Sequence, residues 1–385
     1  MKLFGINFNR QPEIVKVSAP QAFSTPFLKV GSGNLALPHV QNATSGRGVV
    51  YFGVDNLYPQ LINQMYYTSP IHGAIVDFTC RAVIGGGVDI VTDESASQKL
   101  DAGIFLRKIG GDKLFRTLTT DFYLHNRVAL LLNFSDSGVL NSVKRIDPST
   151  VRYKFDGGVE YSDDWSTHHG RKPLTKYSKS GVNTGERFWE YKIETAGMDY
   201  YPLPTYSSAL NWCFLDGEQS FLQKNNIQNS IFPSVYIRRP KRFANNDEID
   251  SFKAGLQRQK GAESAGHVGV LSGDGFENTP EVVAPPISQN DNLFVQTEKS
   301  IKDNICFAHK INPSIMGIKV AGSLGNAQEL EMSYSIWENI VVYPLREVIE
   351  DIGEELVRVA NAKGKFIVND YKALVIKSQT QNPAI

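Results

Sequence analysis

The residues of this chain best suited to chemistry are a dense group of carboxylates near its C-terminus. They lie at helical spacings, at Glu347, Glu350, Asp351, Glu354 and Glu355. Two acids one helical turn apart can act as an acid and a base in catalysis. The same spacing is typical of the solvated face of an amphipathic helix, and we interpret the group in that way.

Other combinations that bind metals or phosphates are weak. His168 and His169 are adjacent, so on an extended segment they point in opposite directions, which favours a solvated loop over a metal site. Gly85, Gly86 and Gly87 follow a predicted helix instead of joining a strand to a helix, which argues against a phosphate loop. The phosphate-loop, dinucleotide, zinc-protease and serine-hydrolase motifs do not occur in the sequence. We therefore predict no metal site, no cofactor and no enzymatic activity, and a mechanical or architectural role.

Two long predicted helices, residues 289–311 and 327–362, are joined by a loop at 312–326. Each helix carries an apolar stripe at spacings of three, four and seven residues. Pro344 lies inside the second helix, where it removes a backbone donor, so we expect a kink there. The loop contains three glycines and one cation, Lys319. A loop of this kind between two stiff helices is positioned to contact something outside the packed core.

The composition indicates a globular chain without bulk affinity for nucleic acid. Of 385 residues, 41% are hydrophobic, and 40 Lys and Arg balance 40 Asp and Glu. The three cysteines, Cys80, Cys213 and Cys306, are far apart and lack zinc spacing, which predicts a reducing compartment. No stretch has the length of a membrane span, and the N-terminus lacks the hydrophobic core of a signal peptide. We expect cytosol-like surroundings and no membrane partner.

The remaining segments alternate helices with antiparallel strands, which predicts an α+β chain. Residues 1–49 are polar and arm-like, either an interacting arm or a loose terminus. Ser69 and Pro70 begin a helix that the three glycines end. An apolar run, a Ser-Asp-Ser-Gly turn, a second strand and a short Asp-Pro-Ser-Thr turn predict a hairpin over residues 127–155.

The order of these parts resembles a known family. The segments that carry the resemblance are SPIHGAIVDFTCRAVIGGGVDI, FYLHNRVALLLNFSDSGVLNSVKRIDPSTVRY and FLQKNNIQNSIFPSVYIRRP. The most specific is NICFAHKINPSIMGI followed by NAQELEMSYSIWENIVVYPLREVIEDI. Together they resemble the portal proteins of tailed bacteriophages of the HK97-like type, over about residues 50–376. The chain departs from that family in two ways, because its helical crown is reduced or absent and its clip is compact.

The resemblance implies a division into portal-type parts. They are an N-terminal arm (1–49), a wing (50–215), a first stem helix (216–235), a small α/β clip (236–288), a second stem helix (289–311), a tunnel loop (312–326), a long kinked helix of the wing or crown (327–362), and a C-terminal strand and tail (363–385).

The resemblance also implies a function. The chain would form a ring, usually of twelve copies, at one vertex of a capsid in the virion, assembled in the host cytoplasm. The ring would be the channel for packaging and ejecting double-stranded DNA, held loosely and without sequence specificity. Its other partners would be the large terminase subunit, the major capsid protein or scaffold, and a head–tail adaptor.

Several residues are candidates for these contacts. Lys319 in the tunnel loop and Lys299, Lys302 and Lys310 on the second stem helix are candidates for the DNA channel. The candidates for partner docking on the clip are Arg238, Arg239, Lys241, Arg242, Asp247, Glu248, Lys253 and Arg258.

Each of these residues also has a simpler interpretation that stays open. Lys319 is either part of a ring of charge or a simple exposed lysine, and the basic run of the clip either meets DNA or a partner or only solubilises an edge strand. The lysines of the second stem helix either line the channel or pair with acids of a neighbouring subunit. The alternatives for the whole chain are a head–tail adaptor ring without a portal role and an enzyme whose site forms from distant residues.

Overall fold

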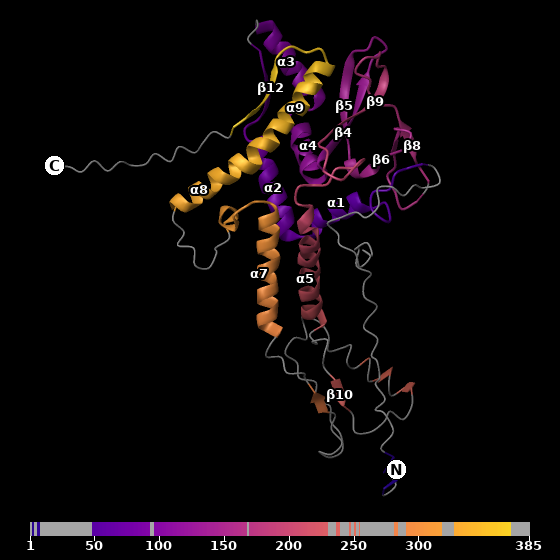
Figure 1. The fold of residues 1–385 in the computed structure, drawn as a ribbon, viewed down its shortest axis with the longest axis vertical. Coiled ribbons are helices and arrows are strands. Elements are labelled where there is room, and N and C mark those ends of the chain that lie inside the picture. The colour runs from indigo at the N-terminus through magenta and orange to yellow at the C-terminus, as the bar shows by residue number, and fades with distance from the viewer. Residues whose placement is uncertain are drawn as a thin grey trace, which may run out of the picture. The chain divides into compact units, whose positions relative to one another are not determined.

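The computed structural model describes the central part of the chain and short pieces near its start and middle. The described residues are 2–3, 6–7, 48–92, 96–167, 169–229, 236–238, 246–247, 250–251, 254, 281–283, 290–317 and 327–370. The chain divides into two compact units (Figure 1). The larger contains Ser32–Glu218 and Phe294–Ile385, and the smaller contains Met1–Gly31 and Gln219–Leu293.

Helix α2 (Pro70–Ile84) lies at the centre of the larger unit and packs against α1 (Tyr58–Thr68), α4 (Gly111–His125) and α9 (Tyr343–Val359). Its sequence sets both of its ends. The Ser69 hydroxyl accepts a hydrogen bond from the His72 amide, and Pro70 fits the first turn because it needs no amide partner there. Gly85 ends the helix with φ of 50°, a backbone conformation that glycine adopts readily.

Two three-stranded antiparallel sheets flank the helices. In the first, β4 (Arg127–Phe134) lies between β5 (Leu140–Ile146) and β9 (Gly185–Lys192), and its apolar sequence is almost entirely buried. The second has the order β6 (Val151–Tyr153), β7 (Val159–Tyr161), β8 (Lys172–Leu174). A separate antiparallel pair joins β3 (Gly87–Val91) to β12 (Lys365–Asn369), so the two ends of the larger unit meet in one ladder.

The predicted long helix is present but irregular. Helix α8 (Ala327–Trp337) passes through a five-residue π-helix, η6 (Glu338–Val342), into α9. The Tyr343 amide bonds to the Glu338 carbonyl, five residues back, immediately before Pro344. Because Pro344 has no amide to donate, a wider turn at this point leaves fewer carbonyls without partners. A π-turn is one of the recognised causes of a helix kink.

The other elements complete the two units. They are α3 (Ala96–Ile109), α5 (Leu210–Asn229), α7 (Asn290–Ala308), β10 (Tyr236–Arg238) paired with β11 (Glu281–Val283), β1 (Lys2–Leu3) paired with β2 (Ile6–Asn7), and the short 3-10 helices η1 (Pro148–Thr150), η2 (Ser207–Ala209) and η5 (Pro313–Met316). Helices α5 and α7 overlap the ranges predicted for the two stem helices, and their assignment as a stem stays a prediction. The mixture of helices and antiparallel strands confirms the predicted α+β class. Among the described residues, no helix combines the length and the apolar character needed to cross a membrane.

Candidate functional site

The first turn of α2 holds the start of α5 through a carboxylate. The Asp216 carboxylate accepts hydrogen bonds from the Ser69 hydroxyl at 2.6 Å and from the Ile71 amide at 3.2 Å. A carboxylate beside the free amides of a helix N-terminus is stabilised by them and by the helix dipole. Asp216 therefore fixes α5 to α2 at a defined position.

The same turn of α2 holds the end of α7 through a buried chain of rings. The His72 Nδ1 atom lies 2.9 Å from His309 Nε2, and the Tyr123 hydroxyl lies 2.7 Å from His309 Nδ1. The ring of Tyr206 stacks on His309, with the centroids 4.8 Å apart. Burial lowers the pKa of His72 to about 3 and that of His309 well below its usual range, so both rings are neutral at pH 7. Neutral rings can pass one hydrogen bond to the next without burying a charge.

We call these residues, Ser69, His72, Tyr123, Asp216 and His309, the helix-root junction. It joins the N-terminal part of α5 and the C-terminal end of α7, which we call the roots of these helices, to one turn of α2. The opposite end of α2 is held by Arg346 of α9, whose guanidinium donates to the Val83 carbonyl at 3.0 Å and to the Ala82 carbonyl at 3.2 Å. Helix α2 thus connects the two predicted stem helices to the long helix.

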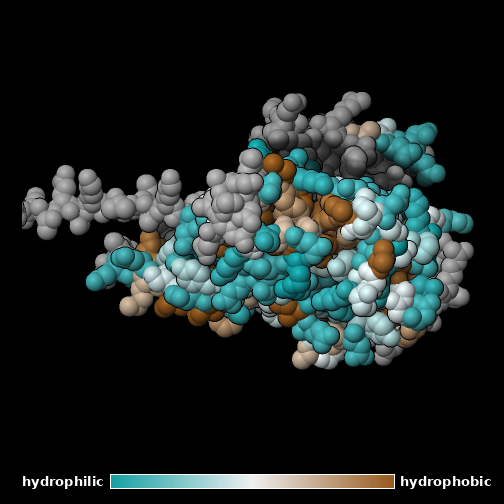
Figure 2. Space-filling view, turned by 90° about the horizontal axis from the view of Figure 1, so that it is seen from above, coloured by the Kyte–Doolittle hydropathy of each residue, from teal (hydrophilic) through white to brown (hydrophobic). Residues whose placement is uncertain are grey.

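Helix α8 leaves the core with large apolar side chains uncovered. On one side, Trp337 and Val341 are buried, and the Trp337 ring contacts Phe78. On a neighbouring side of the helix, Met332, Ile336 and Ile340 follow one another every four residues and are 68%, 53% and 54% exposed. Six large hydrophobic residues of α8, η6 and the start of α9 are exposed in the single chain, namely Leu330, Met332, Tyr334, Ile336, Ile340 and Tyr343. Figure 2 shows hydrophobic side chains gathered at the edge of the larger unit from which α8 projects in Figure 1. An apolar surface of this extent is typical of a protein–protein interface.

Two of the predicted channel lysines, Lys299 and Lys302, lie one turn apart on α7, and Lys310 follows the end of the helix. Lys299 and Lys310 are exposed and Lys302 is partly exposed. Glu298 and Asp303 stand one helical turn from Lys302 and Lys299, so the described part of α7 carries both signs of charge. The structure does not test whether this face lines a channel.

The other predicted contact residues belong largely to undescribed segments. Arg238 ends β10, opposite Glu281 of β11, and Asp247 is exposed in a short helical piece. The remaining candidates lie outside the described residues, as does His168. They are Lys319, Arg239, Lys241, Arg242, Glu248, Lys253 and Arg258. Their roles stay predictions.

The carboxylate group on α9 holds a strand in place. The Glu350 carboxylate accepts the Val368 amide at 2.9 Å, and the Glu354 carboxylate accepts the Phe366 amide at 2.8 Å. Two of the acids interpreted as a solvated face therefore bind the backbone of β12. Among the described residues, no group of His, Cys, Asp and Glu is arranged to hold a metal ion.

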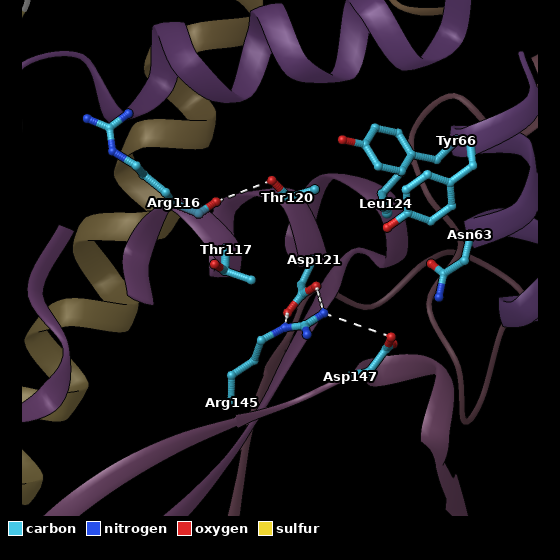
Figure 3. A pocket seen from close by; sticks show the side chains of 10 residues that line it. Asn63, Tyr66, Arg116, Thr117, Thr120, Asp121, Leu124, Arg145 and Asp147 are labelled. Atoms are coloured by element: carbon cyan, nitrogen blue, oxygen red, sulfur yellow. Dashed lines mark hydrogen bonds and ion pairs between the residues drawn. The ribbon is translucent and has the colours of Figure 1, made fainter. Parts of the chain in front are cut away.

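A polar pocket of about 350 Å³ opens between α1, α4 and the end of β5 (Figure 3). The Arg145 guanidinium donates to both oxygens of Asp121, at 2.5 and 2.6 Å. Burial raises the pKa of the Asp121 carboxyl, and the bond to Arg145 opposes that rise. Tyr67 at the rim is 81% exposed, and Arg116 is exposed as well. Sequence reasoning pointed neither to this pocket nor to the helix-root junction.

Comparison with solved structures identifies chains of the same fold in gene transfer agent particles. A chain of the virion of a native gene transfer agent particle matches with a TM-score of 0.54 and 17% identity, over 85% of this chain and 86% of that one. A chain in the neck of the native particle computed with C12 symmetry matches with a TM-score of 0.54 and 18% identity, over 84% and 87%. An HK97 family phage portal protein from Corynebacterium diphtheriae has a TM-score of 0.47 and 15% identity, over 75% and 88%.

No protein-family model matches the sequence, and no curated protein matches it either. The chain therefore shares its fold with chains of virion and neck assemblies, in agreement with the portal-type fold predicted from the sequence.

Proposed function

We propose that this chain is the subunit of a portal ring at a capsid vertex, the channel through which double-stranded DNA is packaged and ejected. The observation that carries the proposal is the uncovered apolar surface of α8 and η6 on a chain with the fold of virion neck subunits. In the ring, the large terminase subunit docks on the clip, and the capsid protein and a head–tail adaptor contact the outside. Twelve copies agree with the C12 symmetry under which a neck of similar fold was computed.

The exposed apolar surface supplies a large part of the area that a stable contact between copies needs. The six exposed hydrophobic residues leave on the order of 600 Å² open to solvent, against roughly 800 Å² that each partner buries in a standard interface. Because α8 and η6 are apolar on two sides, and the side with Trp337 is covered by its own chain, the side with Ile336 is left for a neighbour. A closed ring requires heterologous contacts of this type, in which two different surfaces of one subunit meet.

The charge of the chain suits a channel through which DNA slides. Each phosphate that a protein neutralises adds affinity, which resists movement of the duplex. The chain has equal numbers of basic and acidic residues, and Lys299 and Lys302 of α7 each have an acid one helical turn away. A wall formed by α7 helices would therefore present mixed charge and low net attraction for DNA.

The proposal is tested by examining the purified full-length chain at micromolar concentration by negative-stain electron microscopy. Annular particles with a central hole are expected. Compact single subunits at high protein concentration would contradict the proposal, and so would closed dimers. Packaging of DNA into capsids that carry the protein then tests the channel role separately from ring formation.

A further inference from the structure

The uncovered side of α8 combines apolar and acidic groups. Glu329, Met332, Ile336 and Ile340 are three, four and four residues apart, which places them on one side of the helix. All four are exposed. The sequence of α8 and η6 contains three glutamates and no lysine or arginine. A surface that covers this side must therefore offer apolar contact and positive charge together.

The pocket between α1, α4 and β5 offers both. Tyr66, Tyr67 and Leu124 contribute apolar surface to it, and Tyr67 alone is 81% exposed, unusually high for an aromatic side chain. Arg145 is committed to the buried carboxylate of Asp121 and, at 3.9 Å, to Asp147, which also lines the pocket. Within the described part of the chain, the Arg116 guanidinium forms no ion pair, so its charge is available to an outside group. Figure 3 shows Arg116 and Tyr66 at opposite ends of the pocket, with the Arg116 guanidinium directed outward, away from Asp121 and Arg145.

The two surfaces lie on different sides of the larger unit. In Figure 1, α8 projects from one side, and α1, which forms one wall of the pocket, lies on the other side of α2. Both belong to the larger unit, so their separation is a property of one compact body. Neighbours related by rotation about a ring axis bring such opposite sides together.

We propose that this pocket receives α8 of the adjacent copy, with Met332 of the neighbour against Tyr67 and Glu329 of the neighbour against Arg116. The inference rests on the proposed ring, and it names the receiving surface of that ring. A volume of about 350 Å³ accommodates one or two side chains of the neighbouring helix. The apolar contact supplies the affinity, and the ion pair fixes the register of the helix in the pocket.

Disulfide formation between two variants that each carry one introduced cysteine tests the contact. Tyr67→Cys and Met332→Cys proteins are mixed and oxidised, and Val139→Cys replaces Tyr67→Cys in the control mixture, because Val139 is also exposed, at 56%. The three native cysteines, Cys80, Cys213 and Cys306, are buried and do not interfere. The test mixture is expected to give cross-linked dimers of one chain of each variant, well above the control. Rings that assemble normally without this cross-link would overturn the proposed contact and leave the ring itself standing.

Exchange of charges tests the register. Arg116→Glu and Glu329→Lys are each expected to raise the protein concentration needed for half assembly by roughly tenfold, as for removal of a partly buried interfacial ion pair. The double variant, which restores opposite charges in reversed order, is expected to assemble at a concentration within about twofold of the wild type. The pairing is wrong if each single change leaves the assembly concentration unaffected. It is also wrong if the double variant raises that concentration by the product of the two single effects, and another partner then occupies the pocket. Absence of rings from the wild-type protein would instead overturn the proposed function.

Discussion

Replacing Ile336 and Ile340 together by aspartate is expected to prevent ring assembly and to leave the subunit folded. The two side chains are 53% and 54% exposed in the single chain, so each offers roughly 100 Å² of apolar surface to a neighbour. At about 25 cal/mol per Å², covering both contributes about 5 kcal/mol per interface. That energy corresponds to a loss of between three and four orders of magnitude in the association constant of each contact. Burying two unpaired carboxylates adds a further cost in the same direction.

The assay is mass photometry over a range of protein concentrations, with thermal unfolding of each variant measured in parallel. Val139→Asp is the matched control, since Val139 is 56% exposed in the turn between β4 and β5 and lies far along the chain from α8. The control is expected to assemble as the wild type does. If the double variant assembles at wild-type concentrations with an unchanged melting temperature, this side of α8 is not an interface and the reasoning fails.

Three further predictions concern the helix-root junction and the connecting loop. Because burial lowers the pKa of His72 to about 3 and that of His309 below its usual 6.5, the unfolded chain binds more protons between those values. The free energy of unfolding is therefore expected to fall as the pH drops from about 6.5 towards 3. His309→Gln should flatten this dependence in urea titrations at several pH values, and an equally steep profile would show that these histidines are not its cause. Asp216→Asn is expected to lower the free energy of unfolding by about 1–2 kcal/mol through its weaker bonds to the start of α2, with Glu218→Gln as a neutral control on the same helix. Lys319→Ala is expected to leave ring assembly intact and to alter DNA packaging or retention, and failure to assemble would instead make the loop a structural joint.

The fold could be predicted where the sequence pattern is local. The start of α2 at Ser69 and Pro70, its end at the glycines, and the hairpin of β4 and β5 all follow from caps, turn residues and an apolar run. The irregularity of the long helix at Pro344 follows equally from the missing amide of proline. Helix α3 was not predicted, because its residues lack a strong apolar period.

The candidate site could not be predicted because it depends on residues far apart in the chain. His72 and His309 are 237 residues apart, and neither belongs to a recognisable ligand or catalytic motif. Single histidines near helix ends are common, so the only available signal was their apolar surroundings. The glutamates of α9 show the same limit, since Glu350 and Glu354 have the spacing of a solvated face and yet bind the strand β12. Helical spacing identifies a shared side of a helix and not what packs against it.

The most direct test is a cryo-electron microscopy reconstruction of the full-length protein assembled at high concentration. The proposal predicts a closed ring with rotational symmetry, α7 helices around a central hole, and α8 of each subunit against the next subunit. A monomer at every concentration would contradict it, and a ring whose hole is lined by other elements would contradict the assignment of α7 to the channel wall.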